Sequence, residues 1–454
     1  MEDEVDMKAE SEPPLARATF SIRSGVCGRA PTRRRWRLDL GPGLEHIGMP
    51  RFTTWLCGAL LAVSTGASLA QAVAAPDVDP ATLVRRPRAS WSQAEREYGF
   101  SHWDRLFEAR TIQRGEHVRA LPPGAGLATF EPGGEGARQL QRNIDDFKVA
   151  GIVVLHDGKV RLERYSLGHS ASGRWVSFSM AKSVTSTLVG AAIKDGAISS
   201  VDDLVTRYIP ELRGSAYDGV TLRQVLTMSS GAKWNEDYGD PAADVALFYS
   251  MPVEPGLDAT VSYMKKLVRA APPGEKWHYN TGETNLIGVV VARATKKDLA
   301  TYASEKIWAR YGMEQDATWM VDRTGNVHGG CCIAATTLDY ARVGQFILEG
   351  ARVDGQSIVA DGWLEAATRR QIDNGQSGGG YGYQWWTRDN GSFSAVGIHG
   401  QQIHIDPSRR LVIVINSVPP EAILSKENLA ARIALFDAIR AAIDAEGRHG
   451  ARKP

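Results

Sequence analysis

The sequence is poor in cysteine and has almost no net charge. Its 454 residues include four cysteines, and 53 lysines and arginines balance 52 aspartates and glutamates to a formal charge of +1. So few cysteines, without a C-x-x-C pair, exclude a disulfide scaffold and a cysteine-type zinc site. Adjacent cysteines seldom bridge without strain, so we expect Cys331 and Cys332 to be structural, with no catalytic role. The near-zero charge gives no electrostatic reason to expect a nucleic acid or an anionic membrane as partner.

Two common hydrolase signatures are also missing. None of the ten histidines stands in an H-E-x-x-H spacing, which argues against a zinc hydrolase. There is no G-x-S-x-G elbow, so an α/β-hydrolase esterase is not supported. We therefore expect no metal and no organic cofactor. Hydrophobic residues make up 43% and charged residues 23% of the chain, as in an ordinary globular protein.

The N-terminus differs from the rest of the chain. Residues 1–48 turn from acidic to basic with almost no apolar periodicity, which predicts a non-native or disordered extension. After Met49, a short basic start, an apolar run and small-residue sites of the A-x-A type are typical of a secretory signal peptide over residues 49–74. A membrane span is the weaker interpretation because serine, threonine and glycine interrupt the run. We expect an exported protein, periplasmic or secreted, whose translation starts at Met49 and whose mature chain has no stable membrane span.

The mature chain has strand signals at both ends and a helical middle. Two hairpins are predicted: residues 151–165, turning at Asp157-Gly158, and residues 402–415. Residues 427–446 repeat apolar positions at helical spacing. This order predicts an α+β fold, an α/β sandwich with an antiparallel sheet built from both chain ends, flanked by helices and carrying an inserted mainly helical region. The expected organisation is an N-terminal extension packing on the core (75–140), an α/β region (141–190 and 330–446) and a mainly helical region (191–329).

Ser179 and Lys182 form the most informative pair. Apolar residues after Ser179 repeat at helical spacing, so the two side chains, three residues apart, share one face of the first helical turn. A serine hydroxyl becomes a good nucleophile when a neighbouring base takes its proton. Burial and the positive end of a helix can lower the pKa of a lysine enough for it to be that base. The alternative is a capping serine beside a solvated lysine.

Two further segments could complete such a site. Tyr279 precedes another apolar helix, and a phenol near a serine–lysine pair can protonate the leaving group as a general acid. The alternative is an aromatic anchor under a loop. In the segment Ala395-Val396-Gly397-Ile398, the glycine lets a backbone N–H approach a ligand closely, as an oxyanion donor must. A bend in a strand is the alternative there.

Taken together, the S-x-x-K pair, the tyrosine before Leu-Ile-Gly and the Ala-Val-Gly-Ile segment resemble the serine β-lactamase and penicillin-binding superfamily. Segments 220–231, 329–344 and 381–386 resemble its class C-related branch, and most of all the 6-aminohexanoate-dimer hydrolases and related esterases. The resemblance covers approximately residues 90–445 and implies the serine β-lactamase/penicillin-binding fold.

The resemblance also implies roles for individual residues. Ser179 would be the acylated nucleophile and Lys182 its base. Tyr279 would be the proton relay, and the backbone N–H groups of Ser179 and Ile398 would form the oxyanion hole.

Two positions depart from the family pattern. Thr281 stands where the family usually has an amide, and its shorter hydroxyl can still hydrogen-bond Lys182 or substrate. Ala395-Val396-Gly397 replaces the Lys-Thr-Gly of β-lactamases, so the ammonium that holds a substrate carboxylate is missing. Losing such a charge-assisted contact costs on the order of 1.5–3 kcal/mol. We therefore expect no strong β-lactamase activity, and neutral amides or esters as substrates.

Four side chains are candidates for substrate binding: Tyr238, Thr281, Trp386 and His399. Tyr238 lies where this branch has a mobile substrate-covering loop that bears a tyrosine, although it could equally be a surface aromatic. Trp386 and His399 are candidates to line the same pocket. For His399, a packed and hydrogen-bonded imidazole is the alternative.

The predicted activity is hydrolysis of amide or ester bonds in small, uncharged molecules through an acyl-enzyme on Ser179. One alternative is a D-alanyl-D-alanine carboxypeptidase or a weak β-lactamase. A second alternative is a non-catalytic binding protein on the same fold. The expected partner is a small amide or ester substrate, with no nucleic acid, and the sequence leaves the oligomeric state open.

Overall fold

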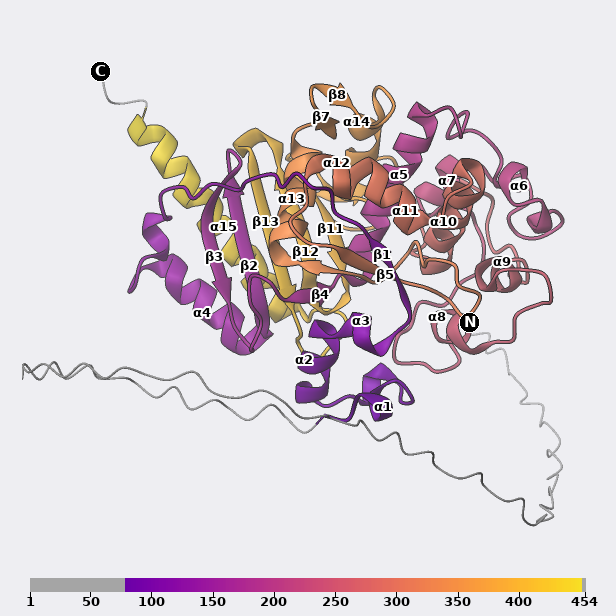
Figure 1. Cartoon of the computed structure of the whole chain (residues 1–454), viewed down its shortest axis with the longest axis horizontal. Helices are drawn as coiled ribbons and strands as arrows, with labels where there is room; N and C mark the ends of the chain where they lie inside the picture. Colours follow the sequence, from indigo (N-terminus) through magenta and orange to yellow (C-terminus); the bar gives the residue numbers. More distant parts are fainter. Residues whose placement is uncertain (1–77, 451–454) are drawn as a thin grey trace, which may run out of the picture. The chain divides into compact units, whose positions relative to one another are not determined.

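A seven-stranded antiparallel sheet organises the fold, in the order β3-β2-β13-β12-β11-β10-β9. The computed structural model describes residues 78–450, so the predicted extension (1–48) and signal peptide (49–74) lie outside the described residues. The strands of the sheet are β2 (Val149–His156), β3 (Lys159–Tyr165), β9 (Gly379–Tyr381), β10 (Trp386–Arg388), β11 (Phe393–Gly397), β12 (Gln401–Asp406) and β13 (Leu411–Ser417). Early and late segments of the chain lie side by side in this sheet (Figure 1), which confirms the predicted α+β fold.

Both predicted hairpins are present in the sheet. Between β2 and β3, Asp157 and Gly158 have φ values of 53° and 72°, the two positive angles that a tight hairpin turn of type I′ requires. Strands β12 and β13 pair from Asp406 opposite Leu411 onward. The late hairpin is therefore adjacent, through β13 and β2, to the early one.

Helices cover both faces of the sheet. Along β13, the side chains of Leu411, Ile413 and Ile415 pack with β2 and with helices α4 (Glu135–Phe147) and α15 (Lys426–Gly450). The intervening Val412 and Val414 belong to the core on the other face, which also holds α5 (Ala181–Lys194) and α13 (Thr337–Leu348). This alternation is the period of two that a strand buried on both faces requires. The predicted helix over residues 427–446 is confirmed within α15.

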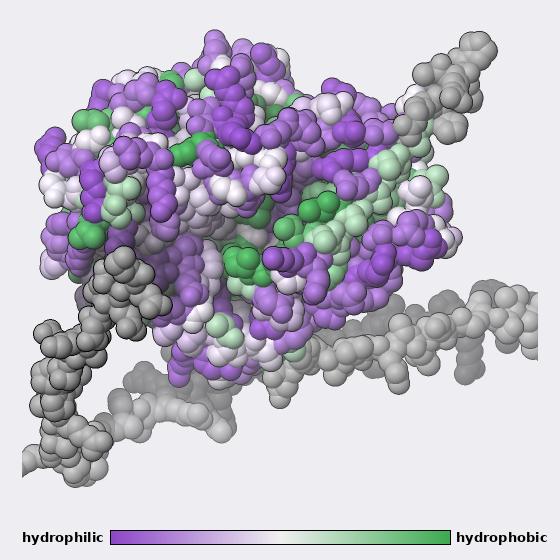
Figure 2. Space-filling model, turned by 180° about the vertical axis from the view of Figure 1, so that it is seen from behind, coloured by the Kyte–Doolittle hydropathy of each residue, from purple (hydrophilic) through white to green (hydrophobic). Residues whose placement is uncertain are grey.

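Helix α15 also carries apolar surface. Figure 2 shows apolar residues gathered along this helix, where Leu429 and Ile433 are 45% and 46% exposed. Because α15 packs on the sheet face opposite α5, this surface is remote from the helix that carries Lys182. None of the helices within residues 78–450 is long and apolar enough to cross a membrane.

The remaining elements are the helices of the middle region, a second sheet and several short helices and strands. Helices of the middle region gather beside the sheet (Figure 1): α6 (Val205–Tyr208), α7 (Leu222–Leu226), α8 (Asp244–Ser250), α9 (Ala259–Met264), α10 (Thr281–Thr295), α11 (Leu299–Ala303) and α12 (Ala309–Tyr311). A four-stranded sheet has the order β1-β5-β6-β4, with β1 (Ala109–Ile112), β4 (Arg174–Val176), β5 (Ala317–Met320) and β6 (Ile333–Thr336). The smaller elements are α1 (Pro80–Leu83), α2 (Gln93–Ser101), α3 (Trp103–Leu106), α14 (Trp363–Thr368), β7 (Arg352–Val353) and β8 (Gln356–Ser357). Residues of α1–α3 pack with β4 and with Phe178, immediately before Ser179.

Candidate active site

Ser179 lies in a short 3-10 turn, Phe178–Met180, that leads directly into α5. The turn begins with an unusual backbone: Phe178 has a φ of 43°, a conformation that a bulky residue adopts only when its surroundings impose it. Lys182 follows in the first turn of α5, and its Nζ lies 3.1 Å from Ser179 Oγ. Ser179 is 7% exposed and Lys182 is 2% exposed. The predicted pair is therefore in direct contact and out of bulk water.

Lys182 is held by three acceptors. Its Nζ donates to Ser179 Oγ, to Thr281 Oγ1 at 3.1 Å and to the Gly330 carbonyl oxygen at 2.7 Å. Burial lowers the pKa of Lys182 to about 8, against an opposing effect from the negative charge of Glu236. A neutral amine is consequently available near physiological pH, as a general base needs.

Tyr279 approaches the same serine from the facing side. It precedes Asn280, which caps α10 by accepting a hydrogen bond from the Glu283 N–H at 3.2 Å. The Tyr279 ring centroid lies 5.2 Å from Lys182 Nζ. Burial and the charge of Glu236 raise the pKa of Tyr279 well above its usual value, while a hydrogen bond with Ser179 lowers it. Tyr279 is thus a protonated phenol in contact with Ser179.

Glu236 is a functional candidate that the sequence analysis missed. Its carboxylate accepts hydrogen bonds from the Thr281 N–H at 3.0 Å and from the Thr281 hydroxyl, the Tyr238 hydroxyl and the Trp234 indole N–H. Thr281 therefore joins Glu236 to Lys182, because its oxygen accepts from the lysine while its hydrogen goes to the carboxylate. In the sequence, the one feature that could have pointed to Glu236 is its position two residues before Tyr238, in the predicted substrate-covering loop. The four donors come from both that loop and α10, which no local pattern reveals.

The segment predicted to supply an oxyanion donor runs beside the backbone of Ser179. A Cβ added to Gly397 would lie 2.4 Å from the Ser177 carbonyl oxygen and 3.1 Å from Ser179 N. Only glycine permits so close an approach. Ile398 follows directly at the end of β11, so the structure brings Ile398 and Ser179 to the same place.

Comparison with known proteins agrees with this geometry. A family model described as Beta-lactamase matches residues 137–436, which include Ser179, Lys182, Tyr279 and Ile398. The chain belongs to the beta-lactamase family. It is 30% identical over 352 residues to the 6-aminohexanoate-dimer hydrolase of Paenarthrobacter ureafaciens, an alignment that covers 73% of this chain and 88% of the relative. The chain is accordingly a serine hydrolase, and the predicted family resemblance is confirmed.

Two solved structures have a similar fold. A Bacillus anthracis protein provisionally assigned as a 6-aminohexanoate-dimer hydrolase superposes with a TM-score of 0.67 at 25% identity, covering 77% of this chain and 94% of that one. A penicillin-binding protein homologue from Caulobacter crescentus has a TM-score of 0.55 at 16% identity, covering 70% and 99%. The second likeness concerns the fold alone.

An aromatic cluster flanks the tyrosine of this family site. Trp386 stacks on Tyr279 with ring centroids 5.9 Å apart and an interplanar angle of 27°. Trp277 contacts both rings, and Tyr381 contacts Trp277 and Trp386. The structure thus brings Trp386 next to Tyr279, at the side of the site opposite α5.

His399 lies elsewhere, among side chains that support the nucleophile turn. It is buried, its Nδ1 is 3.0 Å from the Pro419 carbonyl oxygen, and its ring centroid lies 5.0 Å from Phe100 and 5.6 Å from Phe178. Burial lowers the pKa of His399 to about 4, so the imidazole is neutral at physiological pH. Its contacts are those of the packed, hydrogen-bonded imidazole that the sequence left as an alternative.

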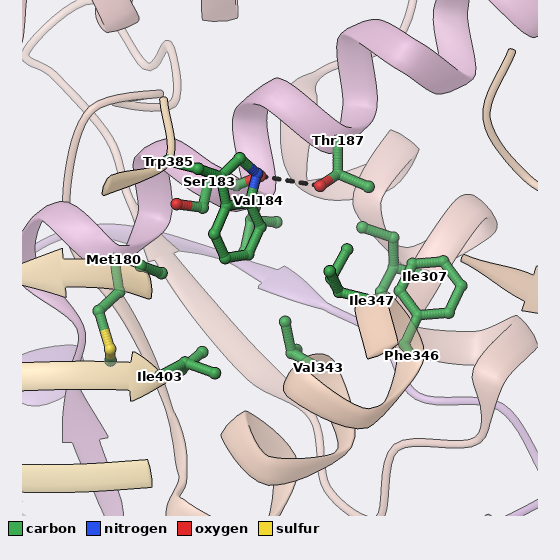
Figure 3. A pocket seen from close by; sticks show the side chains of 11 residues that line it. Met180, Ser183, Val184, Thr187, Ile307, Val343, Phe346, Ile347, Trp385 and Ile403 are labelled. Carbon is green, nitrogen blue, oxygen red and sulfur yellow. Dashed lines mark hydrogen bonds between the residues drawn. The ribbon is translucent and has the colours of Figure 1, made fainter. Parts of the chain in front are cut away.

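Ala395, which stands where β-lactamases have a lysine, faces the protein interior. The residue is 1% exposed and lines an internal cavity of about 10 Å³ beneath α5. Met180, Ser183 and Val184 line the cavity on the α5 side, with Val343, Phe346 and Ile347 of α13 across from them (Figure 3). Ala395 thus lies in apolar surroundings behind the nucleophile helix and brings no charge there.

Cys331 and Cys332 are joined by a disulfide bond. From the sequence, adjacent cysteines were expected to bridge only seldom, and for this pair that expectation was wrong. Most disulfides join cysteines that are further apart in the sequence. Here adjacent cysteines are bonded because they lie in a turn between Gly330 and β6, where Cys332 has a φ of 75°. The bond lies next to the carbonyl group that contacts Lys182.

Proposed function

We propose that this serine hydrolase cleaves amide or ester bonds of small, uncharged substrates through an acyl-enzyme on Ser179. The observation that carries the proposal is the contact between Lys182 Nζ and Ser179 Oγ, 3.1 Å apart, together with a pKa for Lys182 of about 8. A buried amine of that pKa is neutral in a useful fraction of molecules at neutral pH and can accept the serine proton.

In the acylation step, Ser179 Oγ attacks the substrate carbonyl carbon while its proton passes to Lys182 Nζ. The carbonyl oxygen becomes an oxyanion and accepts hydrogen bonds from the N–H groups of Ser179 and Ile398, whose close approach Gly397 permits. The carbon–nitrogen or carbon–oxygen bond then breaks. Tyr279 donates its proton to the leaving amine or alcohol and regains one from Lys182, which lies beside its ring.

Deacylation reverses these roles with water as the nucleophile. Water loses a proton to the Tyr279–Lys182 pair and attacks the acyl carbon. The ester bond to Ser179 breaks, and the proton returns to Oγ. Each group is then back in its starting state, with the substrate split into an acid and an amine or alcohol.

Three observations support the substrate class. The half-buried rings of Trp277, Tyr279 and Trp386 offer apolar surface beside the reacting centre, with Tyr381 packed behind them. Ala395 provides no cation for a substrate carboxylate. The relative at 30% identity is a 6-aminohexanoate-dimer hydrolase, which favours a linear amide over a β-lactam. Tyr238 and Thr281, both hydrogen-bonded to Glu236, are proposed to contact the substrate from the loop side.

The test is a panel of short p-nitrophenyl esters, linear amides and β-lactams, assayed on the wild type and on Ser179→Ala. We expect turnover of esters or linear amides, little turnover of β-lactams, and loss of all turnover in the variant. Wild-type activity in Ser179→Ala would contradict the nucleophile assignment. Rapid labelling by a fluorescent penicillin with slow release would instead favour a D-alanyl-D-alanine carboxypeptidase.

We also propose that the protein is exported, on the sequence pattern of residues 49–74. The test is cell fractionation followed by N-terminal sequencing of the isolated protein. Export predicts a mature N-terminus near residue 75 outside the cytoplasm. A cytoplasmic protein that retains residues 49–74 would contradict the proposal.

A further inference from the structure

The bonded pair Cys331–Cys332 lies directly behind the catalytic lysine. Cys331 is 8% exposed and Cys332 is 1% exposed, and both belong to the core cluster that contains Phe178. Gly330 precedes the pair and donates its N–H to Asn285 Oδ1 of α10 at 2.8 Å. The pair therefore lies between α10 and the turn that carries Ser179.

Three residues of this segment, Gly330, Cys332 and Ile333, contact the nucleophile turn and its lysine. The Gly330 carbonyl oxygen accepts from Lys182 Nζ at 2.7 Å, and the Cys332 N–H donates to the Phe178 carbonyl oxygen at 3.4 Å. Ile333 then exchanges two hydrogen bonds with Ser177: its N–H donates to Ser177 Oγ at 2.9 Å, and its carbonyl oxygen accepts from Ser177 N at 2.7 Å. The backbone on both sides of the sulfur–sulfur bond is thus attached to the residues that flank Ser179.

The backbone at this contact needs to be held in place. Cys332 has a φ of 75° and Phe178 has a φ of 43°, and the two residues are hydrogen-bonded to each other. Non-glycine residues in this region of φ are strained and persist where the surroundings over-determine them. A disulfide between neighbours closes a small ring that contains the peptide bond between them and so restricts the torsions of Cys332. Opening the ring would leave Cys332 free to relax to a negative φ and to shift the Gly330 carbonyl.

We propose that the Cys331–Cys332 ring is a redox-sensitive positioning element that holds the Gly330 carbonyl against Lys182, so that reduction to two thiols slows acylation of Ser179. This inference rests on the proposed function, since it assumes that Ser179 is acylated.

The chemistry of the reduction is thiol–disulfide exchange with a dithiol. One reductant thiolate attacks a cysteine sulfur and breaks the sulfur–sulfur bond, and the second then closes on the mixed disulfide. Two electrons and two protons pass to Cys331 and Cys332, and the reductant leaves as a cyclic disulfide.

The experiment compares oxidised and dithiothreitol-reduced full-length protein. Reduction is verified by maleimide labels mapped to Cys331 and Cys332 in peptides, since the full chain also contains Cys27 and Cys57. Acylation is followed by the rate of Ser179 labelling with a fluorophosphonate. Because displacement of a catalytic group by about 1 Å can cost 10²-fold in rate, we expect labelling to slow by about tenfold or more. Losing the carbonyl that stabilises the ammonium should also shift the acidic limb of the pH–rate profile toward lower pH. A change in folding stability alone would not move that limb.

Matched variants separate positioning from folding. Cys331→Ser combined with Cys332→Ser should show the slow rate of the reduced protein with no response to dithiothreitol, at a Tm within a few degrees of the wild type. An unchanged labelling rate and pH profile in verified reduced protein would overturn the inference. Isolation of fully active protein in which Cys331 and Cys332 are both free thiols would overturn it too, as would a loss of rate that merely follows loss of folded protein. Ser179→Ala is the separate control: labelling that persists in this variant defeats the proposed function itself, whatever the cysteines do.

Discussion

The two sides of the candidate site are built in different ways. On the α5 side, Ser179 and Lys182 are three residues apart, and a single helical turn brings their polar atoms to 3.1 Å. On the facing side, Thr281 and Glu236 are 45 residues apart and meet only because the loop before α8 lies against the first turn of α10. The first side depends on local geometry, and the second depends on tertiary packing.

The two sides of the site also shift the pKa of Lys182 in opposite directions. Burial beside α5 lowers the pKa of Lys182, whereas the negative charge of Glu236 raises it, with a balance at about 8. Thr281 lies between the two side chains and hydrogen-bonds to both. The α5 side therefore holds the proposed nucleophile and its base, while Glu236 on the facing side adjusts the protonation of that base. Substitutions on each side should therefore have different signatures.

Removing the base from the α5 side should have the largest effect. In Lys182→Met the side chain keeps its length but has no amine to accept the serine proton, so kcat/KM for ester hydrolysis should fall by about 10³-fold. The matched control is Lys194→Met at the other end of α5, where the exposed ammonium lies 3.6 Å from Asp361; this variant should keep wild-type rates. In the wild type, kcat/KM should rise with pH through about 8 as Lys182 loses its proton. A rate in Lys182→Met within tenfold of the wild type would show that another group is the base.

Displacing Gly397 and Ile398, the proposed oxyanion segment, from Ser179 should have the next largest effect. In Gly397→Ala the added methyl would lie 2.4 Å from the Ser177 carbonyl oxygen, so β11 must shift relative to Ser179. Because oxyanion donors act only at short range, kcat should fall by about 10²-fold. Gly447→Ala on α15 is the control, since beyond the backbone of its own helix the added methyl meets nothing within 4 Å. Unchanged kcat in folded Gly397→Ala would exclude Ile398 as an oxyanion donor.

Neutralising Glu236 tests the facing side. Glu236→Gln removes the charge that raises the pKa of Lys182, so the acidic limb of the kcat/KM profile should move to lower pH. The amide also replaces one acceptor oxygen with a donor among four incoming donors, and we expect kcat/KM to fall by about tenfold. Asp237→Asn, which makes the same charge change at an exposed position on the same loop, should leave the limb where it is. A limb that stays in place in Glu236→Gln would mean that the two sides of the site are not electrostatically coupled.

The features that could be predicted from the sequence are those that depend on local geometry, and the features that were missed depend on tertiary packing. The Ser179–Lys182 contact, the hairpin at Asp157-Gly158 and helix α15 were predictable because each depends on spacing over a few residues. Glu236 was not, because its four donors converge from a loop and from α10. The placement of His399 under Phe178 was left open for the same reason. The Cys331–Cys332 bond was missed because a rule about average cysteine geometry was applied to a turn with an uncommon backbone.

The smallest expected effect concerns Glu283, a buried carboxyl on the facing side that the mechanism does not use. It lies in the first turn of α10 and accepts a hydrogen bond from the Ser230 hydroxyl, and burial raises its pKa to about 8. Because the folded state binds this proton more tightly than the unfolded state, stability is fully present below a pH of about 4.5 and declines as pH rises toward 8. Glu283→Gln cannot ionise, so its Tm should fall less than that of the wild type between pH 5 and pH 8, by a few degrees. Since Glu283 contacts neither Ser179 nor Lys182, kcat at pH 7 should change less than threefold.

The measurement is thermal unfolding at matched pH values. The control is Glu275→Gln, which makes the same change at an exposed position in the loop before α10. Parallel Tm curves for the wild type and Glu283→Gln would show that Glu283 is already ionised in the folded protein, and the buried charge would then need a partner on the facing side.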